Sequence, residues 1–142
     1  MPIRCAIVSQ DRKVYEDEAD MVVLPGSDGV MGILPNHTPL LTTLQFGVIT
    51  VRKNKDEQVF TVSGGFAEVL PDSVTILADA AENVDEINVM RAEDARRRAE
   101  EMLKKASVDS DPDKYMALQT ALRRSNLRLD AVKRYRQGQR QR

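Results

Sequence analysis

The fold of the first half of the chain is decided by residues 48–63, which read VITVRKNKDEQVFTVS. Apolar and β-branched residues alternate between two faces on both sides of a polar turn at Asn54-Lys55-Asp56. Alternation with a period of two is typical of half-buried strands. Two such strands joined by a short polar turn predict a β-hairpin.

More strands are predicted on either side of this hairpin. They cover the short apolar or alternating segments 3–7, 21–24, 66–70 and 74–78. Pro25-Gly26 is expected to end the second of these segments in a turn, and Gly64-Gly65 is expected to break the strand that precedes it. Short strands that recur about every ten residues are typical of an all-β sandwich or barrel.

The hydrophobic period changes after Glu82, where helical spacing replaces alternation. A first helical stripe consists of Ile87, Met90, Ala95, Ala99, Met102 and Ala106. A second stripe consists of Tyr115, Leu118, Leu122, Ser125, Leu129 and Val132. Ser110 or Asp111 is expected to cap the second helix, with Pro112 at its first position. Two helices joined by a short loop predict an antiparallel hairpin, and because both stripes are modest, that hairpin should be only weakly attached.

Charge is distributed unevenly along the 142 residues, although the formal net charge is only −1. Residues 1–84 carry six Lys and Arg against twelve Asp and Glu, whereas residues 85–142 carry fifteen against ten. From Asp113 onward, nine basic residues accompany two acidic ones. A basic tail beside an acidic body favours contact with an acidic partner, the alternative being a solvated helix surface.

Composition argues against several classes of function. One His and one Cys exclude a multi-His metal site and an internal disulfide. Aromatic residues make up 4% of the chain and Trp is absent, which argues against a stacking surface for nucleic acid. No apolar run approaches the roughly 20 residues that cross a bilayer, and no secretory signal is recognised, so we expect a soluble or peripheral protein of a reducing compartment. The chain also lacks a phosphate-binding loop and a catalytic constellation, so we expect no enzymatic activity.

Three motifs connect the chain with a known family. They read GILPNHTPLL at residues 32–41, VSGGFAEV at residues 62–69 and VTILAD at residues 74–79. In this order, and followed by a helical tail, they closely resemble the epsilon subunit of the bacterial F-type ATP synthase. The resemblance extends from the first strand to about Val132.

The resemblance implies a ten-stranded β-sandwich at residues 1–84 and an antiparallel two-helix hairpin, with a basic C-terminal tail, at residues 85–142. It implies a non-catalytic rotor subunit, peripheral to the cytoplasmic face of the bacterial cell membrane. The β-sandwich would bind the gamma subunit of the central stalk and rest on the membrane ring of c subunits, coupling proton flow to ATP synthesis. The mobile hairpin would extend between the alpha and beta subunits of the catalytic head and inhibit ATP hydrolysis.

Two contact regions follow from the same resemblance. The region that faces the rotor ring is matched by Val30, Met31 and His37. The cations that would meet an acidic stretch of the catalytic head are Arg123, Arg124, Arg128, Lys133, Arg134 and Arg136. Attraction of this kind steers and holds an inserted helix, and it weakens as the salt concentration rises.

Some members of that family bind ATP in the folded hairpin through a motif that matches residues 87–92, INVMRA, with Asn88 where the motif has Asp. The positions that match nucleotide contacts are Glu82, Ile87, Asn88, Arg91, Ala92, Arg98, Arg124 and Arg128. No cofactor is expected to be required, and ATP would be a regulatory ligand. The alternative function is therefore an ATP-sensing switch, and the alternative role of these arginines is a solvated helix face. A nucleic-acid-binding protein is a third reading, against which the acidic body argues, so no nucleic acid is expected among the partners.

Overall fold

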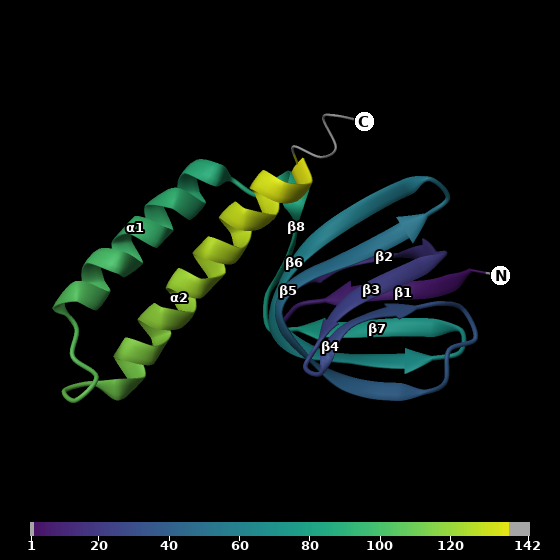
Figure 1. Ribbon diagram of the computed structural model, residues 1–142, viewed down its shortest axis with the longest axis horizontal. Coiled ribbons are helices and arrows are strands. Elements are labelled where there is room, and N and C mark those ends of the chain that lie inside the picture. The colour runs from purple at the N-terminus through teal and green to yellow at the C-terminus, as the bar shows by residue number, and fades with distance from the viewer. Residues whose placement is uncertain (1, 137–142) are drawn as a thin grey trace. The chain divides into compact units, whose positions relative to one another are not determined.

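The hairpin predicted at residues 48–63 lies at the centre of a larger β-structure (Figure 1). In the computed structural model, which describes residues 2–136, its strands are β5, Leu40–Lys53, and β6, Asp56–Leu70. Lys53 pairs with Asp56 across a tight turn in which Asn54 has a φ of 56°. Asn tolerates this left-handed conformation, so the polar turn fixes the register of both strands.

Six further strands complete the sheet. They are β1, Ile3–Val8; β2, Lys13–Ala19; β3, Met21–Gly26; β4, Gly29–Ile33; β7, Ser73–Ala78; and β8, Ala81–Asn83. Within the described part of the chain, the strand order is β2-β1-β7-β6-β5-β3-β4, and β8 pairs with β6. β1 and β7 are parallel, whereas the other pairs are antiparallel.

The two longest strands pass from one layer of a β-sandwich to the other (Figure 1). The first half of β6 pairs with β8 and its second half pairs with β7, while β5 accompanies both halves. Gly64 and Gly65 lie between the halves of β6 with φ values of 93° and 126°. The strand that was expected to break at this glycine pair therefore bends and continues. Because β5 and β6 count in both layers, the eight strands provide the ten segments of the predicted sandwich.

The turn expected at Pro25-Gly26 lies further along the chain. β3 continues to Gly26, which pairs with Gly29 of β4, so Ser27 and Asp28 form the turn. Pro25 is tolerated inside the strand because the register between β3 and β5 shifts between Val23 and Gly26, where a missing N–H interrupts no regular ladder.

The hydrophobic core of the β-sandwich follows the predicted alternation. In β1, Ile3, Cys5 and Ile7 are fully buried, as the period of two requires. Other large core residues are Val22, Leu24, Ile33, Ile49, Val51, Phe60, Val62, Val69, Val74 and Ile76. Burial raises the pKa of the Cys5 thiol to about 12, so Cys5 stays protonated at neutral pH and serves as a small core residue.

The chain divides into two compact units, Met1–Val84 and Asp85–Arg142, and the second unit is the helical hairpin. After a short 3₁₀ turn, η1, at Val84–Glu86, it contains α1, Val89–Lys105, and α2, Pro112–Ala131, followed by a π-helical turn, η2, at Val132–Arg136. The two α-helices pack side by side (Figure 1). The end of the predicted basic tail, residues 137–142, lies outside the described residues.

The predicted start of α2 is confirmed, because Asp111 is its N-cap and Pro112 occupies its first turn. The predicted stripe of α2 is also confirmed, since each of its residues is buried or half-buried. The stripe of α1 is wrong in part, because Met90 and Met102 are 75% and 46% exposed. The smaller residues Ala92 and Ala99 are buried instead, and they permit close approach of the helices.

Candidate functional site

An exposed apolar patch, called here the outer patch, lies on the outer face of one layer of the β-sandwich. It consists of the half-buried Val8 and the exposed Leu41, Phe66 and Leu77, and Leu41 is a diagonal neighbour of Phe66 because it pairs with Glu68. Val8, Leu77 and Phe66 are register partners on the adjacent strands β1, β7 and β6, so their side chains share one face. Leu41, Phe66 and Leu77 are 69%, 44% and 42% exposed. Adjoining apolar side chains that remain open to solvent mark interaction surfaces.

The sequence contained a signal for the outer patch that the strand predictions did not use. Strands that are buried on one face alternate apolar and polar residues, but β6 and β7 place apolar residues on both faces. Phe66 is exposed next to buried Ala67, and Leu77 is exposed between buried Ile76 and Ala78. Which of these residues touch across strands depends on the register, which the sequence does not give.

The residues predicted to face the rotor ring are distributed along β4. Val30 is 78% exposed beside the β3–β4 turn, while Met31 packs against the core. His37 lies beyond the other end of β4, where its Nδ1 donates a hydrogen bond to the Thr38 carbonyl at 2.7 Å. The backbone N–H of Asn36 bonds to the Pro71 carbonyl at 2.7 Å and ties this loop to the β6–β7 turn. Val30 therefore lies near the start of β4, and His37 lies in the loop that follows its other end.

The predicted ATP motif forms the start of α1. Asn88 is the N-cap, and its side-chain oxygen accepts the backbone N–H of Arg91 at 3.0 Å. An Asp at this position would cap the helix equally well, so the N-cap role is compatible with either residue. Arg91 and Arg98 are exposed, whereas Ile87 and Ala92 are buried and contribute packing. On α2, Arg124 and Arg128 are half-buried, and Glu82 belongs to β8 in the first unit.

The cations near the end of α2 fall into two groups. Arg123, Lys133 and Arg134 have exposed side chains. Arg136 is half-buried, and its Nη2 donates a hydrogen bond to the carbonyl oxygen of Ile87 at 3.0 Å. The basic segment thus contains exposed cations and one cation, Arg136, that forms a hydrogen bond within the hairpin.

Two family models match the chain, one for each unit. The beta-sandwich domain of the ATP synthase delta/epsilon chain matches residues 2–84, and the long alpha-helix domain of the same chain matches residues 85–133. This chain belongs to the ATP synthase delta/epsilon chain family. As a member of this family it is a non-catalytic subunit.

Several curated relatives of this delta/epsilon chain are similar over most of their length. The ATP synthase epsilon chain of Herpetosiphon aurantiacus is 46% identical over 133 residues, which cover 94% of this chain and 96% of the relative. The epsilon chain of Halalkalibacterium halodurans is 44% identical over 126 residues, which cover 89% and 93%.

Two solved structures share the fold. A chain of the mitochondrial ATP synthase of Euglena gracilis, from a structure of OSCP, F1 and the c-ring, is 21% identical with a TM-score of 0.75, covering 92% of this chain and 81% of its own. A chain from the central stalk and c-ring of the Tetrahymena thermophila enzyme is 15% identical with a TM-score of 0.62, covering 93% and 97%. At these identities, the likeness shows a common fold.

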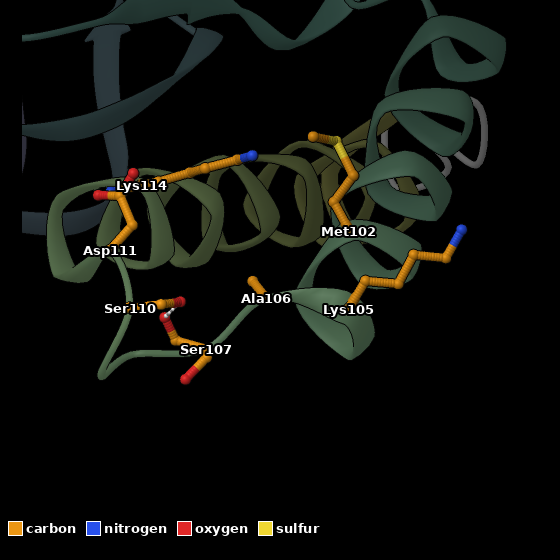
Figure 2. A pocket seen from close by; sticks show the side chains of 7 residues that line it. All are labelled: Met102, Lys105, Ala106, Ser107, Ser110, Asp111 and Lys114. Carbon is orange, nitrogen blue, oxygen red and sulfur yellow. Dashed lines mark hydrogen bonds between the residues drawn. The ribbon is translucent and has the colours of Figure 1, made fainter.

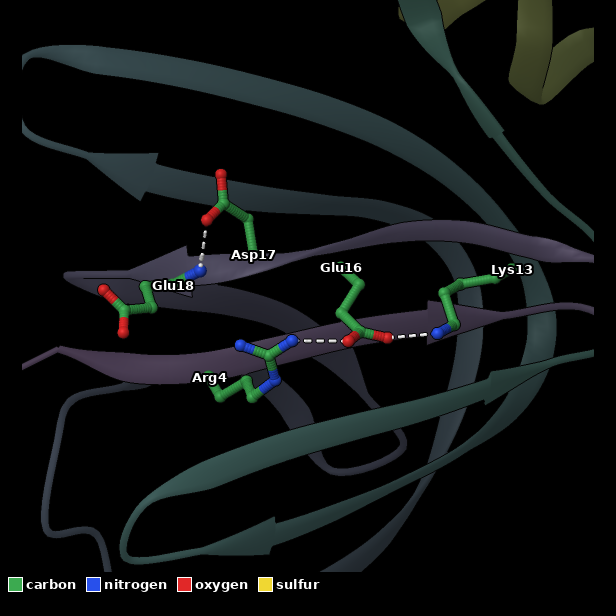
Figure 3. A network of polar contacts seen from close by, with 5 residues as sticks. All are labelled: Arg4, Lys13, Glu16, Asp17 and Glu18. Carbon is green, nitrogen blue, oxygen red and sulfur yellow. Dashed lines mark hydrogen bonds and ion pairs between the residues drawn. The ribbon is translucent and has the colours of Figure 1, made fainter.

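A network of exposed charges borders the delta/epsilon sandwich at its edge strand, β2 (Figure 3). Glu16 is paired with Lys13 and Arg4, and these hydrogen bonds, from Lys13 above all, lower the pKa of Glu16. A hydrogen bond from Lys53 at 3.0 Å, and then one from the N–H of Glu18, lower the pKa of Asp17. Exposed pairs of this kind stabilise a fold only slightly, but charge on an edge strand disfavours pairing between sheets.

A pocket of about 390 Å³ lies at the turn between α1 and α2 of the delta/epsilon hairpin (Figure 2). Its Ser and Asp side chains already serve the turn, because the Ser110 hydroxyl donates to the Ser107 carbonyl at 3.2 Å and Asp111 caps α2 through the N–H of Lys114 at 3.1 Å. This depression is therefore a consequence of the turn. Residues 2–136 contain no group of three or more side chains suited to hold a metal ion, and no helix among them is long and apolar enough to cross a membrane.

Proposed function

We propose that this chain is a central-stalk subunit of a bacterial ATP synthase, couples proton flow to ATP synthesis, and inhibits ATP hydrolysis through its helical hairpin. The observation that carries the proposal is the match of both units, in order, to the two domains of the delta/epsilon chain. The structures with the same fold are described as F1 with the c-ring and as a central stalk with the c-ring. In this proposal the protein is a peripheral component at the cytoplasmic face of the cell membrane.

In this proposal the β-sandwich holds two partners through different surfaces. The outer patch binds the gamma subunit, because a complementary apolar surface would remove Leu41, Phe66 and Leu77 from water. Val30, which is exposed at the β3–β4 turn, faces the ring of c subunits. Two separate surfaces suit a subunit that transmits torque between its partners.

Replacing Phe66 with glutamate should weaken binding to the gamma subunit about 100-fold, because a charge in a desolvated apolar contact removes packing and adds an unpaired group. The affinity of the full chain for gamma would be measured by calorimetry. Val30→Glu is the matched control, since it places the same charge on another exposed apolar residue, and it should leave gamma binding unchanged. Wild-type affinity for Phe66→Glu, in a chain that is folded by circular dichroism, would contradict the role of the outer patch.

The helical hairpin would supply the inhibitory function. Lys133 and Arg134 are exposed in the last turn of the hairpin, where they could meet acidic groups of the alpha and beta subunits, and Arg123 is exposed further back on α2. A helix of the 20 residues of α2 is about 30 Å long, which suffices to reach between subunits of the catalytic head. Insertion between them would block the conformational changes that hydrolysis requires.

A second candidate function is the sensing of ATP by the folded hairpin. It is favoured by the exposed guanidinium of Arg91 beside the capped N-terminus of α1, because both Arg and a helix N-terminus attract phosphate. Titration of the full chain with ATP should shift the amide signals of Arg91 and Arg98. Asn88→Asp, which restores the family motif, should tighten binding about tenfold, because its carboxylate would accept a charge-assisted hydrogen bond from the adenine amino group. Unchanged spectra of both proteins at millimolar ATP would exclude this function.

A further inference from the structure

The helical hairpin is closed at its base by a hydrogen bond between residues far apart in the sequence. The Nη2 atom of Arg136 donates to the carbonyl oxygen of Ile87 at 3.0 Å. Ile87 is 4% exposed and immediately precedes Asn88, the N-cap of α1. Because α1 and α2 are antiparallel, the end of the second helix meets the start of the first. The bond therefore joins the two chain segments that must separate if the hairpin opens.

The local conformation at Arg136 is also unusual. The chain leaves α2 as a π-helical turn, Val132–Arg136, and such turns are rare and concentrate at functional sites. The backbone N–H of Val132 is shared between the carbonyls of Arg128 and Leu129, as is common at the end of an α-helix. The last residue of this π-helical turn is Arg136, which donates the hydrogen bond to Ile87.

The most buried residues between the two helices have small side chains. The fully buried residues of α1 and α2 are Ala92, Ala99, Ser125 and Ala131, all of which have small side chains. Small side chains remove little apolar surface from water, whereas a hydrogen bond from a guanidinium in a half-buried site is among the stronger ones.

We propose that Arg136 is a latch that holds the hairpin closed and thereby opposes its inhibitory insertion. The proposal rests on the function proposed above, in which the hairpin opens and enters the catalytic head. Arg136 is also one of the cations expected to meet acidic groups there. A single guanidinium cannot bind the Ile87 carbonyl and a distant carboxylate at once, so closure and insertion compete for the same side chain.

The latch is tested first in the isolated full chain by amide hydrogen exchange. Arg136→Ala should raise the exchange rates of the first turn of α1 and of η2 about tenfold or more, because it removes a charge-assisted bond that opening must break. Arg136→Lys, which retains the charge and one donor group, should restore part of the protection. Lys114→Ala is the matched control: it removes one positive charge from the other end of α2 and should change neither region.

Equal exchange in Arg136→Ala and Lys114→Ala would overturn the latch, whatever the enzyme complex does. The second measurement is ATP hydrolysis by the assembled ATP synthase, which should be more strongly inhibited with Arg136→Lys than with the wild-type chain, because Lys keeps a charge for the acidic groups of the catalytic head but holds the Ile87 carbonyl less firmly. Faster exchange together with unchanged hydrolysis would support the latch and count against the inhibitory function. The two proposals therefore fail in distinguishable ways.

Discussion

Replacing Gly65 with alanine should destabilise the β-sandwich by about 4 kcal/mol. A Cβ at this position would lie 2.2 Å from the carbonyl oxygen of Leu77 and 2.8 Å from the Cα of Ala78. Both are backbone atoms of β7, the strand that pairs with this part of β6, so no side-chain rotation relieves the contact. The φ of 126° adds backbone strain, because residues other than glycine rarely adopt this angle. The sheet must separate or the bend must move, and either change disturbs both layers.

Gly29→Ala provides the matched control for this prediction. Gly29 has a comparable φ of 136°, but a Cβ there would meet nothing within 4 Å. Gly29→Ala therefore introduces the backbone strain without the steric clash, and it should lower the free energy of unfolding by only about 1–2 kcal/mol. Urea unfolding of the full chains, followed through amide signals of β6, would compare the two. Similar losses of stability in both variants would show that the close approach of β7 does not determine the need for glycine at position 65.

The local elements of this protein could be predicted because each follows from a short-range pattern. The alternation of Ile3, Cys5 and Ile7 specifies a strand, and Asp111 with Pro112 specifies a helix start, whatever the rest of the chain does. The course of β6 could not be predicted in the same way. Two adjacent glycines are compatible with a broken strand or with a sharp bend, and the choice depends on whether β7 and β8 pair with the two halves.

The candidate sites depend even more on contacts between distant residues. Phe66 and Leu77 were assigned to strands from the sequence, yet their meeting on one outer face depends on register. Val30 and His37 belong to one region by resemblance, but Val30 lies in β4 beside the β3–β4 turn, whereas His37 lies beyond the other end of that strand. Arg136 was one cation among several in a basic tail, and nothing in the sequence links it to the carbonyl of Ile87.

Removal of the helical hairpin should raise ATP hydrolysis by the assembled enzyme several-fold. If the inhibited state holds about nine tenths of the complexes, its loss increases the rate about tenfold. The chain should end after Val84 rather than after Ala81, because β8 pairs with β6 and Val84 is 2% exposed. The remaining unit contains the whole core of the β-sandwich, so it should fold and keep its affinity for gamma.

The cause of this activation can be separated from a general weakening of the complex. Replacing Arg123, Lys133 and Arg134 together with glutamine keeps the helices but removes their exposed charge, and it should give an intermediate rate. Raising the salt concentration should activate the wild-type complex toward that rate and leave the truncated complex unchanged, since only the former depends on attraction between exposed charges. Equal hydrolysis by wild-type and truncated complexes that both retain gamma would show that the hairpin does not inhibit. The β-sandwich would then account for the coupling function alone, because the contacts proposed for it with gamma and the c-ring do not involve the helices.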